Sequence, residues 1–183
     1  IREEMMGLSF KISPFSFFQP NIFTAEKLYQ KAFDLARIDE KMNVLDLYSG
    51  TGTITQLMAL KAKHATGIEI VEEAVEKAKE NALLNKIDNI DFLCGDVLEE
   101  IEKVSDRYDV VILDPPRAGI APQSLEKILK MKVDKFVYIS CNPKTQLENL
   151  KDFIDQGFII KDFEIFDQFP RSRHLESIAL LTR

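Results

Sequence analysis

The sequence predicts an α/β protein with a doubly wound, mostly parallel sheet, and three observations support this prediction. Short apolar runs alternate with longer amphipathic segments, which is typical of repeated strand–helix units. The apolar run at residues 44–47 leads directly into a turn containing Gly50 and Gly52, and a helical pattern begins at Thr53. Polar residues follow several predicted strands, at the sheet edge where such folds bind ligands.

Length and composition indicate a single domain with a substantial core. The chain has 183 residues, of which 45% are hydrophobic and 30% are charged. Its apolar runs are far shorter than a membrane span, so we expect no membrane association. Two cysteines, Cys94 and Cys141, provide no disulfide framework, which favours a reducing, cytoplasmic setting. The chain begins at Ile1 without a methionine, which suggests a piece of a longer protein.

The first 20 residues are predicted to form a lead-in segment to the main domain. Residues 8–12 alternate between apolar and polar side chains, as in a half-buried strand. An aromatic-rich stretch follows, in which we expect Phe15 and Phe17 to pack beneath the first helix. Gln19 differs, because a neutral amide at the mouth of a pocket can bind either the carboxylate or the amine of a cofactor.

Residues 21–183 are predicted to form the main domain, which starts with a helix over residues 21–37. In that segment apolar side chains recur every three or four positions, as on the core-facing side of a helix. Similar patterns predict further helices over residues 53–63, 72–85, 122–131 and 144–156. Short apolar runs predict strands over residues 44–47, 65–70, 90–94, 109–113, 135–139, 158–166 and 177–182.

The glycine turn indicates which kind of nucleotide is bound. Gly50 and Gly52 allow the backbone to approach a ligand closely, but Thr55 replaces the third glycine of a dinucleotide fingerprint. No lysine follows either glycine, as a phosphate-binding loop would require. Asp46 precedes the turn, where it would repel a phosphate and could accept a hydrogen bond from an ammonium group. These features favour S-adenosylmethionine, although a strand–turn–helix without any ligand is the alternative.

Other predicted strands also end in groups suited to a binding site. Glu69 is placed to accept hydrogen bonds from ribose hydroxyls, and Asp96 from an adenine amino group. Asp114 and Arg117 lie in a loop that two prolines stiffen. Cys141 precedes a predicted helix, whose N-terminus would favour a thiolate, although a lone buried cysteine is more commonly a small hydrophobic residue.

Five motifs together resemble those of one enzyme family. They are Phe18-Gln19, Asp46-Leu-Tyr-Ser-Gly-Thr-Gly-Thr53, Asp114-Pro-Pro-Arg117, Ser140-Cys-Asn-Pro143 and His174-Leu-Glu176. In this order they resemble the RNA 5-methyluridine methyltransferases, the S-adenosylmethionine-dependent (uracil-5-)-methyltransferases of transfer and ribosomal RNA. The resemblance runs from about Leu8 to the last residue. It implies a Rossmann-like class I methyltransferase fold, with a seven-stranded, mostly parallel sheet and an antiparallel last strand.

The resemblance also implies a role for each matching residue. Cys141 would be the nucleophile and Glu176 the base. The cofactor would be bound by Gln19, Tyr48, Thr53, Glu69, Asp96 and Asp114. Asp114 would lie at the boundary between cofactor and base, where it could hold either the uracil edge or the cofactor amine. Arg117 could stabilise charge on a uracil oxygen or bind a phosphate of the substrate, a uridine in a loop or single-stranded region of RNA. Thr53 departs slightly from the pattern, since some members carry asparagine there.

Features outside these motifs bear on how RNA is held. Family members usually carry an N-terminal RNA-binding β-barrel, and some carry an iron–sulfur segment; the sequence contains neither, so we expect no iron–sulfur cluster. A net charge of −6 argues against a broad basic surface, as if RNA affinity resided mainly in the absent part. Lys144, Arg171 and Arg173 could contact RNA, or could simply form a solvated basic surface.

Three alternative functions remain open. An amino-group methyltransferase often has an aromatic residue after Asp-Pro-Pro, where this chain has Arg117. A 5-methylcytosine enzyme typically carries its cysteine in the proline loop, and residues 114–117 contain none. A non-catalytic cofactor- or RNA-binding domain is the third alternative, and in it Cys141 would be inert.

Overall fold

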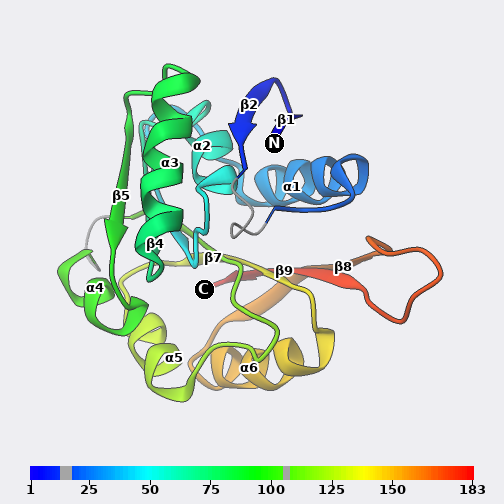
Figure 1. Ribbon diagram of the computed structural model, residues 1–183. Coiled ribbons are helices and arrows are strands. Elements are labelled where there is room, and N and C mark those ends of the chain that lie inside the picture. The colour runs from blue at the N-terminus through cyan, green and yellow to red at the C-terminus, as the bar shows by residue number, and fades with distance from the viewer. Residues whose placement is uncertain (13–17, 105–107) are drawn as a thin grey trace.

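The computed structural model describes residues 1–12, 18–104 and 108–183, so the predicted packing of Phe15 and Phe17 lies outside the described residues. A mixed sheet forms the centre of the domain (Figure 1). Its strands are β3 (Asn43–Leu47), β4 (His64–Glu69), β5 (Ile90–Cys94), β6 (Val110–Leu113), β7 (Lys135–Ser140), β8 (Ile159–Phe166) and β9 (Glu176–Thr182). The helices are α1 (Ile22–Ala36), α2 (Thr53–Ala59), α3 (Glu72–Leu84), α4 (Val97–Val104), α5 (Pro122–Leu129) and α6 (Pro143–Asp155).

The strand order confirms the predicted fold class. The seven strands are arranged β5-β4-β3-β6-β7-β9-β8, and the pairs from β5 to β7 are parallel. Strand β9 runs antiparallel to both β7 and β8. The chain winds outwards from β3 to β5 and then crosses back to β6, so the direction of winding reverses between β3 and β6. Folds of this type bind ligands at such a switch point, outside the carboxyl ends of the strands.

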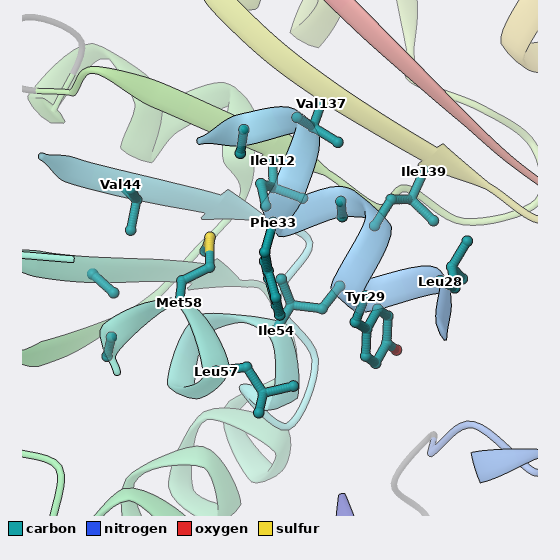
Figure 2. Packing of buried hydrophobic residues seen from close by; sticks show 14 of the residues in the cluster. Leu28, Tyr29, Phe33, Val44, Ile54, Leu57, Met58, Ile112, Val137 and Ile139 are labelled. Carbon is teal, nitrogen blue, oxygen red and sulfur yellow. The ribbon is translucent and has the colours of Figure 1, made fainter. Parts of the chain in front are cut away.

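Strict alternation of side chains explains why the central strands read as continuous apolar runs. Val44 and Ile112 face one layer, whereas Leu45 and Leu113 face the other, and none of the four is exposed. Helices α1, α2 and α3 cover the first face, and α4, α5 and α6 cover the second (Figure 1). Figure 2 shows Phe33 of α1 packed between the helices and the sheet on the first face. A strand buried on both faces needs apolar residues at every position.

A small hairpin precedes this domain, and its first strand was not predicted. Strand β1 (Arg2–Met5) pairs antiparallel with β2 (Leu8–Lys11), which matches the strand predicted over residues 8–12. Two side-chain amides, one in α3 and one at its C-cap, hold β2 by its backbone. Asn81 Oδ1 accepts a hydrogen bond from the Lys11 N–H at 2.8 Å, and Asn85 Oδ1 accepts one from the Ser9 N–H at 2.9 Å. These bonds attach the hairpin to the domain through the backbone of β2.

Two further differences from the prediction concern helices. Helix α4 was not predicted, and it begins after Asp96, whose Oδ1 accepts a hydrogen bond from the Leu98 N–H at 2.8 Å. Helix α2 ends at Ala59, earlier than residue 63. Throughout the described ranges, every helix is too short or too polar to cross a membrane.

Candidate active site

A cavity of about 510 Å³ opens where β3, β4, β6 and β7 end. Its walls combine apolar and polar groups, as small-molecule sites usually do. The apolar part of the wall comes from Met5, Phe18, Ile54, Ile70, Pro115 and Pro116. The predicted site residues that line it are Gln19, Tyr48, Thr53, Glu69, Asp114, Arg117, Cys141 and Glu176. Of the nine residues assigned to catalysis, cofactor binding or substrate binding from the sequence motifs, eight thus meet in one cavity.

Asp96 is the residue that the structure does not bring to this wall. In the part of the chain that the structure describes, it is exposed at the start of α4 and is absent from the lining residues. Its carboxylate caps the helix, as described above. Burial raises the pKa of the Tyr48 phenol to about 12; a hydrogen bond with Ser124 acts in the opposite direction, and the nearby Asp96 adds to the increase. A role for Asp96 in binding adenine stays a prediction.

The glycine turn has the geometry that its sequence predicts. Gly50 and Gly52 have φ angles of 53° and 74°, and Tyr48 adopts a φ of 68°, all in the left-handed region. A Cβ atom at Gly52 would lie 2.6 Å from the ring of Phe92, so only glycine fits there. Glu69 fixes the turn from the next strand, because its Oε2 accepts a hydrogen bond from the Gly50 N–H at 2.9 Å.

Asp46 does not take the position that we expected. Alternation along β3 places its side chain beneath α2 rather than on the cavity wall, and its exposure is 0%. The Thr55 hydroxyl donates to its Oδ2 at 2.6 Å, whereas Oδ1 has no hydrogen-bond partner among the described residues. Burial raises the pKa of Asp46 to about 8, with a smaller contribution from Asp114 and Glu69. A carboxyl group that lies below the turn and outside the lining residues of the described chain is not placed to accept from the ammonium group of a ligand, so that expectation was wrong.

The reactive end of the cavity brings together Asp114, Cys141 and Glu176. Because β9 is antiparallel, its first residues lie beside the end of β7, where Ser177 pairs with Ser140. Glu176 is only 4% exposed, and burial, with a contribution from Asp114, raises its pKa to about 8. Burial also raises the pKa of Asp114 to about 7. The site therefore holds two carboxyl groups that can exchange protons near neutral pH.

The thiol of Cys141 is not activated in the way that the sequence suggested. Burial raises its pKa, and the nearby Glu176 and Asp114 add to this, whereas Arg117 acts in the opposite direction. Helix α6 begins only at Pro143 with Asn142 as its N-cap, so Cys141 lies outside the first turn. The expectation of a helix-stabilised thiolate was therefore wrong for the protein on its own.

Hydrogen bonds join the cysteine loop to the proline loop. Asn142 Nδ2 donates to the backbone oxygen of Arg117 at 3.1 Å, and the Thr145 hydroxyl donates to the same oxygen at 3.3 Å. The guanidinium of Arg117 lies 3.0 Å from Nδ1 of His174, in the segment that leads into β9. Three loops far apart in the sequence are thus held together around the cavity.

Tyr29 and Gln168 are among the polar residues at the site for which the sequence motifs indicated no role. Tyr29 lines the cavity from α1, and Figure 2 shows its hydroxyl at the edge of the apolar cluster. Its place in the apolar stripe of the predicted helix suggested only a core role, although a buried tyrosine hydroxyl usually needs a partner. Gln168, between β8 and β9, is completely buried and donates a hydrogen bond to Gln19. Nothing local in the sequence marks it.

Comparison with known proteins assigns the family. A model of the methyltransferase domain matches residues 38–175, so the chain belongs to the methyltransferase domain family. An uncharacterized RNA methyltransferase of Clostridium tetani is 46% identical over 183 residues, which are 100% of this chain and 40% of that protein. Another, from Caldanaerobacter subterraneus, is 43% identical over 181 residues and is likewise covered to 40%.

A solved structure supports the same assignment. The chain is similar to the tRNA (uracil-54, C5)-methyltransferase of Pyrococcus abyssi, whose crystal structure contains S-adenosyl-L-homocysteine. The two share 33% sequence identity with a TM-score of 0.85, over 100% of this chain and 44% of that one. The chain therefore spans less than half the length of these relatives.

Proposed function

We propose that this chain is the catalytic domain of an S-adenosylmethionine-dependent RNA methyltransferase that methylates C5 of uridine through a covalent cysteine adduct. The observation that carries the proposal is the single cavity that combines the glycine turn and Glu69 with Cys141 and Glu176. The uracil-C5 specificity of the Pyrococcus abyssi enzyme, which is similar over 100% of this chain, supports it.

The cofactor half of the cavity suits S-adenosylmethionine. The Ser49 hydroxyl borders the cavity and is buried without a partner in the described parts of the chain, so it is available to a polar ligand. Glu69 has a carboxylate at the end of β4, where ribose hydroxyls can be bound. Gln19, Tyr48 and Thr53 would bind the remaining parts of S-adenosylmethionine, together with Asp96, which lies near Tyr48. When bound, S-adenosylmethionine supplies an electrophilic methyl group.

The substrate half contains the groups that uracil chemistry needs. C5 of uracil is a weak nucleophile. The Cys141 thiol gives its proton to the neighbouring Asp114, and addition of the resulting thiolate to C6 makes C5 electron-rich. After methylation C5 still carries its proton. Glu176 takes that proton, the C5–H electron pair re-forms the C5=C6 double bond, and the C6–S bond breaks to release the thiolate. A base with a pKa of about 8 is well matched to this step near neutral pH.

Asp114 and Arg117 complete the substrate half. Asp114 lines the cavity together with Glu69 and Cys141, so it can contact either the cofactor or the edge of uracil. Arg117 can stabilise negative charge that develops on a uracil oxygen during addition of the thiolate. The uridine must leave its stack to reach Cys141, which favours loops and single strands of tRNA or rRNA as substrates.

Intact-mass measurement with an RNA loop containing 5-fluorouridine tests this proposal. Fluorine at C5 cannot be removed as a proton, so methylation in the presence of S-adenosylmethionine should leave a covalent protein–RNA adduct. The adduct should form with the unaltered chain and with Cys94→Ala, and should be lost in Cys141→Ala. A chain that binds the cofactor but forms no adduct, alone or within the full-length protein, would favour an amino-group methyltransferase or a non-catalytic domain instead.

A further inference from the structure

A pair of buried side-chain amides lies at the amino-terminal wall of the cavity. Gln168 has 0% exposure, although it lies in the connection between β8 and β9, and Gln19 is 7% exposed. Gln168 Nε2 donates two hydrogen bonds, to Gln19 Oε1 at 3.2 Å and to the backbone oxygen of Asn21 at 3.1 Å. Asn21 Nδ2 in turn donates to the backbone oxygen of Gln168 at 3.1 Å. The two segments are therefore locked together in both directions.

The backbone oxygen of Asn21 fixes the orientation of both amides. A carbonyl oxygen can only accept, so the group of Gln168 that faces it must be the NH₂ group. The same NH₂ group reaches Gln19, which must therefore present its carbonyl oxygen to Gln168. The NH₂ group of Gln19 is then left for the other side, and Gln19 lines the cavity.

The surroundings of Tyr29 agree with this orientation. Burial raises the pKa of its phenol well above the usual value and Asp114 adds to this, whereas a hydrogen bond with Gln19 lowers it. A hydrogen bond lowers the pKa of a phenol when it is donated to the phenol oxygen. Gln19 therefore presents its NH₂ group on the side of Tyr29, which also lines the cavity.

This orientation selects between the two ends of an amino acid. A freely rotating amide could accept from the ammonium group of a cofactor or donate to its carboxylate. An NH₂ group that is held towards the cavity can only donate, and a carboxylate is the acceptor that gains most from a donated hydrogen bond. We propose that Gln168 is a positioning residue that holds the NH₂ group of Gln19 towards the carboxylate of S-adenosylmethionine. This rests on the proposed function, in which Gln19 binds that cofactor.

Gln168→Met separates positioning from folding. Methionine has a similar volume but no donor, so Gln19 loses the contact that fixes its rotation. The replacement also removes Gln168 Oε1, which is buried without a partner across residues 1–12, 18–104 and 108–183, so part of the lost hydrogen bonding is offset. Gln123→Met, at an exposed position of α5, is the matched control.

Calorimetric binding of two ligands provides the test. S-adenosylhomocysteine contains the carboxylate, and its decarboxylated analogue, 5′-(3-aminopropylthio)adenosine, keeps the amine but lacks the carboxylate. Gln19→Ala should weaken S-adenosylhomocysteine by about tenfold or more, and Gln168→Met by about three- to tenfold. Both variants should bind the analogue as the unaltered chain does. In the Gln19→Ala background, Gln168→Met should cause no further loss.

The outcomes distinguish the two proposals. No binding of S-adenosylhomocysteine by the unaltered chain would contradict the proposed function itself. If Gln19→Ala weakens binding but Gln168→Met does not, only the positioning role is wrong. Equal weakening of both ligands by Gln168→Met would indicate a general structural effect, and would also overturn the positioning role. An unchanged affinity in Gln19→Ala would remove the basis of the inference while leaving the uridine chemistry to the adduct experiment.

Discussion

The Thr55 hydroxyl donates a 2.6 Å hydrogen bond to Asp46, directly beneath the turn that forms the cofactor side of the cavity. Asp46 has a pKa of about 8 in the folded chain, compared with an ordinary value of 3.8. Between these values the unfolded chain binds fewer protons than the folded chain, so the free energy of unfolding falls as pH rises. The stabilisation from protonated Asp46 is complete below about pH 4 and is lost as pH passes through 8.

Asp46→Asn should therefore flatten the dependence of stability on pH. Asparagine is neutral and keeps a carbonyl oxygen for Thr55, so the fold should be retained. Denaturation between pH 5 and 8 should show a slope that is shallower by up to about 1.4 kcal/mol per pH unit, the value for a single group. Asp88→Asn, at an exposed position, should leave the slope unchanged. An unaltered slope in Asp46→Asn would mean that Asp46 is already ionised in the folded chain.

Gly52→Ala should damage both stability and cofactor binding. The new methyl group would lie 2.6 Å from the Phe92 ring, at a residue whose φ of 74° already disfavours a side chain. Gly157→Ala is a matched control, because Gly157 has a φ of 87° with no atom within 4 Å of the added carbon. We expect the control to lose about 1 kcal/mol of unfolding free energy and Gly52→Ala to lose about 2–4 kcal/mol. Equal losses in chemical denaturation would show that Phe92 moves aside at little cost.

Glu176→Gln should stop the reaction after methylation. Glutamine cannot accept the C5 proton, so the methylated base should remain attached to Cys141. Intact-mass analysis with ordinary uridine RNA and S-adenosylmethionine should then detect an adduct that carries the extra methyl group. Glu148→Gln, on an exposed part of α6, should turn over without an adduct. Normal turnover by Glu176→Gln would instead mean that another group acts as the base. Asp114, whose carboxyl group lines the same cavity, would then be the candidate.

Asn81→Leu should loosen the amino-terminal hairpin. Asn81 is completely buried, and its amide both accepts from and donates to the backbone of Lys11. Its loss leaves backbone groups of β2 unpaired, at a cost of about 1–3 kcal/mol. Hydrogen exchange at the amides of Ser9 and Lys11 should accelerate, whereas Glu76→Leu on the exposed side of α3 should have no such effect. Unchanged hydrogen exchange would indicate that apolar contacts, rather than Asn81, attach the hairpin to the domain.

The sequence predicted most of the cavity because its residues follow strands. In a parallel sheet all strands end at one edge, so Glu69, Asp114 and Cys141 could be placed together without knowledge of any contact. Asp46 was expected to face the ligand, but its side chain lies on the opposite face of the strand from Leu45 and Leu47. Alternation along residues 44–47 predicts this orientation. Helix α4 had a usable signal in Val97, Ile101 and Val104, which recur at helical spacing.

Other features depended on contacts that no local pattern encodes. Gln168 and Gln19 are 149 residues apart in the chain, and neither neighbourhood suggests a paired amide. The pKa of Cys141 is raised mainly by burial, to which Glu176 and Asp114 from other parts of the chain add, so the short motif around the cysteine gave the wrong direction. The boundary predicted after residue 20 stays a prediction. Met5 and Phe10 of the hairpin are buried in the same apolar cluster as residues of the domain.

The position of β9 between β7 and β8 means that, in the proposed function, the base is the last catalytic group to be synthesised. The cofactor cleft, the cysteine and the proline loop all belong to chain segments that precede Gln156. The base arrives on a strand that must insert between two earlier ones, because β9 follows β8 in sequence but lies inside it in the sheet. A chain that is still being synthesised could thus contain the proposed nucleophile and most of the cofactor cleft before it contains Gln168 and the proposed base. In the proposed mechanism, abstraction of the C5 proton therefore requires β9 to be in place between β7 and β8.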